Sequence, residues 1–257
     1  MTATLSPPLP DRAHEVALGE LGAFLVLLTD LTPDEWGLPT DCPRWSVREM
    51  VAHVTGAMDE GAHLRVLVRH LVLGRRRYPD LCPLDGINEV QVDDRRDATP
   101  ADLLADLADL GPKAAGARRR MPRLMRGRRL PKDTGLPPGS TFGYLLDVIY
   151  PRDVWMHRID VARATGRELA TSTTEADVVA LVVRDLAEVW DGPPTRLVLT
   201  GHGAGAWALG TGDPEATLEA DAVEVCRMLS GRDSSPSVRA SGDSDAERAL
   251  RAARVAF

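Results

Sequence analysis

Cysteine, lysine and long apolar runs are all scarce in this chain. Cys42, Cys82 and Cys226 lie far apart and form no C-x-x-C pair, which argues against a disulfide framework or a cysteine-rich zinc site. The longest apolar runs, such as residues 23–28, are too short to cross a bilayer. The opening MTATLSPPLP has prolines where a signal peptide needs a continuous apolar segment. We therefore expect a cytoplasmic protein with no membrane partner.

Excess positive charge is also lacking. The formal net charge is -7 at pH 7, and aromatic residues make up only 4% of the chain. A surface of this sign repels phosphate backbones and anionic lipids, which argues against a nucleic-acid partner. The arginines cluster at 75–77 and between 118 and 129. We expect them on solvated faces and loops; the alternative is an anion-attracting rim near an active site.

Apolar residues, by contrast, are plentiful, at 44% of 257 residues. That is enough for the core of one large domain or two modest ones. After a loose leader over 1–10, apolar spacing and capping residues predict four helices. They are expected over residues 11–31, 46–73, 99–121 and 141–165. Four helices with long connections are typical of a four-helix bundle, whose core is a common place for metal sites.

The pattern changes after residue 170. It predicts helices over 174–190 and 222–229, a last helix from 245, and strands over 196–200, 206–209 and 216–220. We therefore expect a mainly α domain over residues 1–170, followed by a small α+β domain over residues 171–257.

A glycine-rich segment over 201–206 fits the dinucleotide fingerprint G-x-G-x-x-A. That fingerprint requires a helix to begin there and receive the pyrophosphate, and Trp207 to Pro214 leaves no room for one. We therefore predict a hairpin turn, and no NAD site involving His202.

The residues with the clearest chemistry are His53, Asp153 and His157. His53 lies near the second turn of the helix predicted over 46–73, among apolar neighbours. Asp153 and His157 are four residues apart and share one helix face. If the two helices meet, a carboxylate and two imidazoles form a three-ligand site for zinc or a similar divalent ion, with one position open for catalysis. Spacing alone leaves open a core histidine and an ordinary surface pair.

Three further residues belong to this interpretation. Asp160, one turn beyond His157, is placed to orient that ring through a hydrogen bond. His63 and His70 lie near the far end of the second helix, too far from His53 to serve the same site, and are expected to be structural.

Two segments carry a resemblance to a known family. The segment Trp45-Ser-Val-Arg-Glu-Met-Val-Ala-His53-Val and the later Arg152-Asp-Val-Trp-Met-His-Arg-Ile-Asp160 together resemble the DinB-like metalloprotein superfamily. More narrowly, they are similar to the mycothiol-dependent maleylpyruvate isomerase family of actinobacteria. The segment Cys226-Arg-Met-Leu-Ser-Gly-Arg232 is similar to that family's small C-terminal domain.

The resemblance implies a zinc site of His53, Asp153 and His157, with mycothiol as the fourth ligand. It also implies that Arg232 contacts the substrate, although a surface arginine after a helix is the alternative. Family members often have glutamate where Asp153 stands. The shorter acid should still bind the metal, but the metal would shift.

The leading hypothesis is therefore a zinc- and mycothiol-dependent enzyme, acting as a monomer or homodimer. A zinc-bound thiolate would add to an electrophilic small molecule. Expelling the thiol after bond rotation completes a cis–trans isomerisation, whereas keeping the adduct makes the enzyme a thiol S-transferase. The alternatives are a hydrolase that uses zinc-bound water and a non-catalytic binding module.

Overall fold

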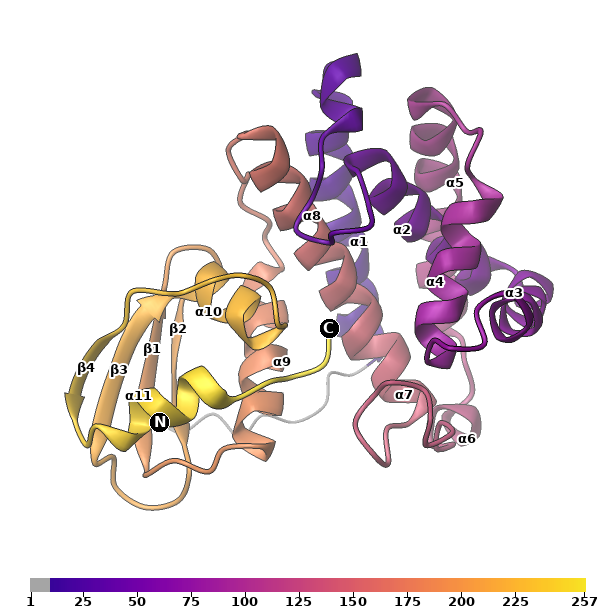
Figure 1. Cartoon of the computed structure of the whole chain (residues 1–257). Helices are drawn as coiled ribbons and strands as arrows, with labels where there is room; N and C mark the ends of the chain where they lie inside the picture. Colours follow the sequence, from indigo (N-terminus) through magenta and orange to yellow (C-terminus); the bar gives the residue numbers. More distant parts are fainter. Residues whose placement is uncertain (1–9) are drawn as a thin grey trace. The chain divides into compact units, whose positions relative to one another are not determined.

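The computed structural model describes residues 10–257 and divides them into two compact units (Figure 1). The first unit ends at Ala170 and the second spans Thr171–Phe257. The leader predicted over residues 1–10 lies outside the described residues, except for Pro10, which begins α1. The first unit contains α1 (Pro10–Thr29), the 3-10 helix η1 (Pro33–Gly37), α2 (Val47–Ala62), α3 (Leu64–Arg77), α4 (Pro83–Asp94), α5 (Pro100–Arg119), α6 (Arg123–Arg126), α7 (Phe142–Tyr144), the π-helical η2 (Leu145–Ile149) and α8 (Tyr150–Thr165).

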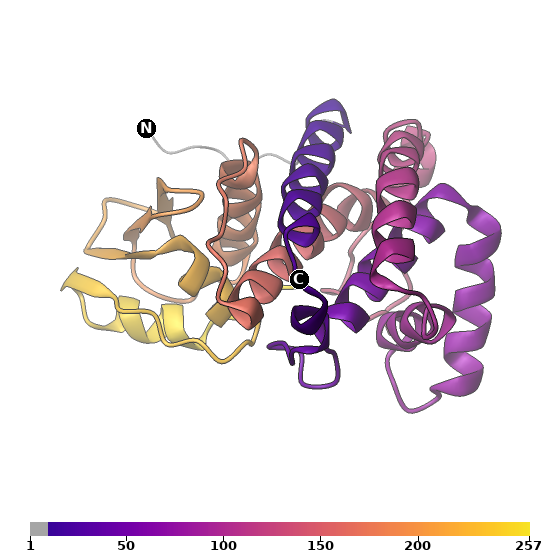
Figure 2. The same ribbon diagram turned by 90° about the horizontal axis from the view of Figure 1, so that it is seen from above.

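The predicted four-helix bundle is present and consists of α1, α2, α5 and α8. Helix α5 packs against α1 and α2, and α8 packs against the same two helices from the other side (Figures 1 and 2). Their inward faces form one buried cluster that includes Phe24, Met50, Leu107 and Val154. Burying apolar surface in this way is the main force that holds the bundle together.

The helix predicted over 46–73 is two helices, α2 and α3. The break lies at His63, whose backbone is extended with φ -134° and ψ 101°. Gly61 weakens helix propensity just before the break, and the His63 ring lies 2.8 Å from the Asp59 carboxylate, which stabilises the extended residue. Because of this break, α3 packs against α4, a helix that the apolar pattern did not predict.

The fourth predicted helix contains a π-helical turn. Segments α7, η2 and α8 run on from one another, and Pro151 lies in the first turn of α8. Proline has no N–H to donate to the carbonyl four residues earlier and clashes with it. A π turn widens the helix at that point and is frequent at functional sites. Gly166 ends α8 with φ +67°, as predicted.

Two arginines of the 118–129 cluster are buried, so the prediction that this cluster is solvated is wrong for them. Arg118 is 5% exposed and its guanidinium lies 3.8 Å from the centre of the Tyr150 ring. Arg126 is 8% exposed and forms an ion pair with Asp147. Partners on other elements compensate for the burial of charge, and composition alone does not show them.

The second unit contains a four-stranded sheet with the order β2-β1-β3-β4. Strand β1 is antiparallel to β2 and parallel to β3, and β3 is antiparallel to β4. The elements are α9 (Glu175–Glu188), β1 (Thr195–Thr200), β2 (Gly205–Leu209), β3 (Ala216–Asp221), α10 (Ala222–Leu229), β4 (Arg239–Gly242) and α11 (Asp245–Ala252). Strand β4 was not predicted because all of its residues are exposed and its sequence lacks an apolar face.

The predicted hairpin turn joins β1 to β2. Gly201 and Gly203 have φ of +77° and +75°, which a residue with a side chain adopts only with strain. The segment is a turn between antiparallel strands, so no helix begins there to receive a pyrophosphate.

None of the helices in the described part of the chain combines the length and the apolar character that crossing a bilayer requires. Cys42, Cys82 and Cys226 form no disulfide bond with one another.

Candidate metal centre

The start of α2 places His53 in the bundle. The Ser46 side chain caps the helix by accepting from the backbone N–H of Glu49, and the Glu49 carboxylate accepts from the backbone N–H of Ser46. This capping box fixes where α2 begins, and therefore where its second turn points. Trp45, just before the cap, stacks on the His53 ring with the centroids 4.8 Å apart and the planes 28° from parallel. The ring is thus held from its own helix and from the loop before it.

Helix α8 brings Asp153 and His157 to the same place. Nε2 of His53 lies 3.4 Å from Oδ2 of Asp153, and Nε2 of His157 lies 3.2 Å from Oδ1 of Asp153. The two imidazole rings are perpendicular, with centroids 5.2 Å apart. The structure therefore brings together the three residues that the sequence singled out, although they come from helices far apart in the chain.

The spacing of these atoms fits a divalent metal ion. Metal–ligand bonds of about 2.1 Å at tetrahedral angles place neighbouring ligand atoms about 3.4 Å apart. The two imidazoles approach different oxygens of the Asp153 carboxylate, at 3.4 and 3.2 Å, and one ligand atom from each residue lies within 4.8 Å of the others, close enough for the three to hold one ion. Aspartate therefore reaches both imidazoles despite being shorter than glutamate.

The charges of the three residues reinforce one another. Burial disfavours ionisation of Asp153, but the charges and hydrogen bonds of His157 and His53 outweigh it and hold the pKa of Asp153 well below its usual range. Burial likewise disfavours the His157 imidazolium, yet Asp153 and Asp160 outweigh it and raise the pKa of His157 to about 9. In the metal-free protein, the proton on the His157 ring therefore takes the place of a bound cation beside the Asp153 carboxylate.

Each imidazole has a second partner on its other ring nitrogen. Nδ1 of His157 lies 3.1 Å from the fully buried Asp160 carboxylate, which confirms the predicted hydrogen bond. Nδ1 of His53 lies 2.7 Å from Oε1 of Gln91 on α4. Gln91 was not predicted, because the helix that carries it, α4, was not predicted either. In both rings, these bonds leave Nε2 facing the site.

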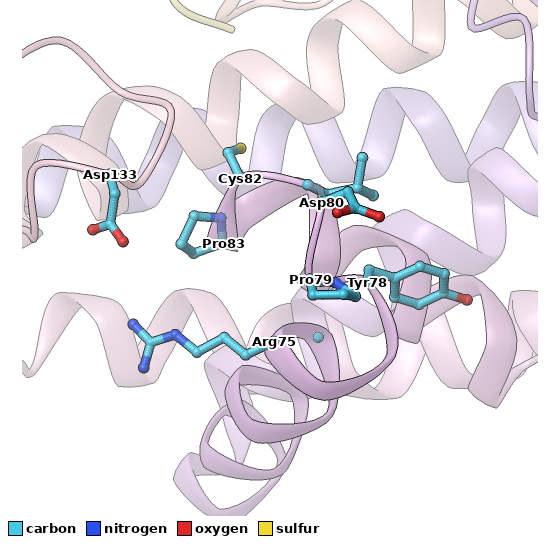
Figure 3. Close-up of a pocket in the computed structure, with 9 residues that line it drawn as sticks. Arg75, Tyr78, Pro79, Asp80, Cys82, Pro83 and Asp133 are labelled. Carbon is cyan, nitrogen blue, oxygen red and sulfur yellow. The ribbon is translucent and has the colours of Figure 1, made fainter.

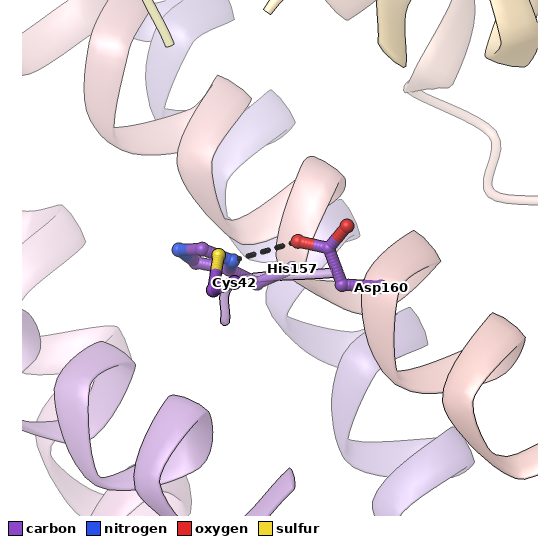
Figure 4. Close-up of side chains that lie close together, drawn as sticks. All are labelled: Cys42, His157 and Asp160. Carbon is purple, nitrogen blue, oxygen red and sulfur yellow. Dashed lines mark hydrogen bonds and ion pairs between the residues drawn. The ribbon is translucent and has the colours of Figure 1, made fainter. Parts of the chain in front are cut away.

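Cys42 forms a second group with His157 and Asp160. One ligand atom from each of the three lies within 4.8 Å of the others, and Figure 4 shows the thiol beside the His157 ring. Nδ1 of His157 already faces Asp160, so a metal bound here would have to displace that hydrogen bond. We therefore take His53, Asp153 and His157 as the candidate metal ligands. Cys42 lies in the loop before α2, where the sequence indicated only a turn.

Arg232 lies in the second unit, just after α10. Its guanidinium donates a hydrogen bond to the Ser230 side chain at 3.0 Å, and its backbone N–H donates to the carbonyl of Arg227. The residue is half-buried. Its role in substrate binding stays a prediction.

A cavity of about 450 Å³ lies beside the loop between α3 and α4 (Figure 3). Arg75 and Cys82 line it, together with the carboxylates of Asp80 and Asp133, so its charge is mixed. None of the three candidate ligands lines it. The cavity that Arg75 lines is therefore not lined by the candidate ligands, and it gives no support to an arginine rim around the metal centre.

Comparisons with known proteins identify the family. The model of the mycothiol maleylpyruvate isomerase N-terminal domain matches residues 18–162. The chain belongs to this family. The matched segment runs from α1 into α8. In this member of the mycothiol maleylpyruvate isomerase family, it therefore contains all three candidate ligands.

Two solved structures have the same fold. One is a mycothiol-dependent maleylpyruvate isomerase, with a TM-score of 0.55 and 16% sequence identity, covering 93% of this chain and 95% of that chain. The other is a histidine-to-alanine mutant of a mycothiol-dependent maleylpyruvate isomerase, with a TM-score of 0.54 and the same identity and coverage. No curated protein matches the chain. The likeness extends over both units, so the second unit also has the fold of the isomerase.

Proposed function

We propose that this chain is a metal-dependent enzyme that uses mycothiol, with His53, Asp153 and His157 as ligands of a divalent ion, most simply zinc. The observation that carries the proposal is the convergence of these three residues, whose ligand atoms lie within 4.8 Å of one another; three protein ligands leave a fourth position for an external ligand. Membership of the family supports mycothiol as that ligand.

The charge of the ligand set favours a thiolate at the fourth position. One carboxylate and two neutral imidazoles leave a divalent ion with one net positive charge, which a thiolate neutralises. A bound divalent ion would stabilise the thiolate near neutral pH. His53 and His157 are buried, whereas the Asp153 side chain is 21% exposed, so an external thiol approaches on the Asp153 side.

The substrate in this proposal is a small electrophile. Thiolate addition to a conjugated double bond, rotation and expulsion of the thiol give a cis–trans isomerisation, whereas a retained adduct gives S-transfer. We propose the isomerisation because the family and the two solved structures are of that type. Arg232 is the residue we assign to a substrate carboxylate.

Metal analysis combined with mycothiol binding tests the proposal. We expect the purified full-length protein to contain about one divalent ion per chain and to bind mycothiol in calorimetry. Removal of the metal with a chelator should abolish mycothiol binding, and restoring zinc should recover it. Turnover of maleylpyruvate or a related electrophile, followed by its ultraviolet absorbance, should require mycothiol.

Three results would count against this function. Protein without a stoichiometric metal would refute the metal centre, and metal-loaded protein that ignores mycothiol would refute the thiol. Turnover of an ester or amide by the loaded enzyme without thiol would instead identify a hydrolase.

Metal affinity should depend on pH. His157, whose pKa is about 9 without metal, must release a proton before its Nε2 binds an ion. Below that pKa, the apparent affinity should therefore rise about tenfold for each pH unit, and it should level off above about pH 9. Asp153 stays ionised over this range and adds no further dependence. Competition with a chromophoric chelator between pH 7 and pH 10 measures the slope, and a flat profile would contradict His157 as a ligand.

A further inference from the structure

A line of buried hydrogen bonds leads from His53 into the protein. Nδ1 of His53 lies 2.7 Å from Oε1 of Gln91, and the Gln91 amide donates to Oε1 of Glu60 at 2.7 Å. Nδ1 of His70 lies 2.6 Å from the same Glu60 oxygen. The four residues come from α2, α3 and α4, and each is 4% exposed or less. His70 thus reaches the candidate metal centre indirectly, through two intermediate residues.

Glu60 fixes the direction of these hydrogen bonds. The Gln91 NH₂ group donates to a Glu60 carboxylate oxygen, which leaves the Gln91 carbonyl oxygen turned toward His53. Nδ1 of His53 must then be the donor. In the neutral ring, the lone pair lies on Nε2, the nitrogen that faces Asp153.

His70 holds Glu60 in place. Its other ring nitrogen, Nε2, lies 2.9 Å from the Asp94 carboxylate, which in turn pairs with the half-exposed side chain of Arg69. Both His70 ring nitrogens therefore face carboxylates. Oε1 of Glu60 is contacted by both the His70 ring and the Gln91 amide, so this buried oxygen has two partners.

Gly56 allows α4 to come this close to α2. A Cβ atom at Gly56 would lie 2.4 Å from Cβ of Gln91, well inside van der Waals contact. The missing side chain is therefore what lets Gln91 reach His53, one helical turn before Gly56.

We propose that Gln91 is a positioning residue that holds His53 as the Nδ1–H tautomer, with Glu60 and His70 fixing the orientation of the Gln91 amide. An amide does not pass a proton from one partner to the next, so the line holds a tautomer and does not conduct protons. The inference rests on the proposed function only in what Nε2 of His53 binds, because the tautomer is a property of the metal-free protein.

Nitrogen-15 NMR of the histidine rings tests this in metal-free, full-length protein, at a pH where the His53 ring is neutral. Wild type should show His53 with the proton on Nδ1. In Gln91→Met, which removes the acceptor, the Nε2–H tautomer should become populated. The near-isosteric Glu60→Gln should do the same, because an amide no longer dictates which way Gln91 points. Thr55→Val, a buried change on α2 outside the line, should leave the tautomer unaltered.

Metal affinity provides the second measurement. Gln91→Met should bind zinc about 10- to 100-fold more weakly than wild type, as is usual when the outer partner of a metal-binding histidine is lost, and Thr55→Val should bind it normally. A wild-type His53 protonated on Nε2, or a tautomer unchanged in both Gln91→Met and Glu60→Gln, would overturn the inference. A locked Nδ1–H tautomer in a protein that binds no metal would support it and refute the proposed function instead.

Discussion

His157→Ala protein is expected to purify without its metal ion. The substitution removes one of three ligands and leaves Asp153 and His53 to hold the ion alone. Loss of an outer partner already weakens metal binding about 10- to 100-fold, so loss of the ligand itself should cost more than about 100-fold. The metal content per chain should fall from about one to near zero, and chelator competition should give the remaining affinity.

His202→Ala is the matched control for this experiment. His202 is also a histidine with a carboxylate partner, Glu175, but it lies in the second unit and outside the cluster. Its replacement should leave the metal content at the wild-type value. Full metal occupancy in His157→Ala would show that the ion binds elsewhere. It would also exclude the group formed by Cys42, His157 and Asp160, because that group shares His157.

Glu20→Ala is expected to destabilise the protein by about 3–5 kcal/mol. Glu20 on α1 and Arg158 on α8 form an ion pair of 3.1 Å, and their side chains are 0% and 1% exposed. Removing the carboxylate leaves the buried Arg158 guanidinium without a neighbouring negative charge, although it still donates to the carbonyl of Ala170, and the protein cannot rehydrate it without opening the bundle. Urea unfolding followed by circular dichroism measures the change.

Two companion variants separate this effect from a general weakening of α1. Glu20→Gln keeps an acceptor for Arg158 and should lose less stability than Glu20→Ala. Glu15→Ala breaks the exposed pair with Arg12 on the same helix and should change stability little. A Glu20→Ala protein as stable as Glu15→Ala would contradict the importance of the buried pair.

The three candidate ligands could be predicted from the sequence because their signals are local. Ser46 and Glu49 mark the start of α2, which sets the face on which His53 lies, and the spacing of Asp153 and His157 needs only helical periodicity. That the two helices meet is a tertiary fact, and it needed the structure.

The surroundings of the site could not be predicted, because they depend on contacts between distant segments. Gln91 lies on α4, a helix with little apolar periodicity. It contacts His53 because the chain breaks at His63 and because Gly56 has no side chain to keep α4 away. The buried Arg118 was placed at the surface for a similar reason, since the aromatic ring that accommodates it lies on α8. Composition describes how polar a segment is and says nothing about its partners.

The distance along the chain between His53 and His157 has a consequence for biosynthesis. A ribosome that has released α2 but not α8 has produced one ligand and no site. The buried ion pair between Glu20 of α1 and Arg158 also cannot form until Arg158, the residue directly after His157, has been made. The ligand set and this buried ion pair can therefore be complete only after the same short segment of α8 has emerged, and a chain truncated before it has neither.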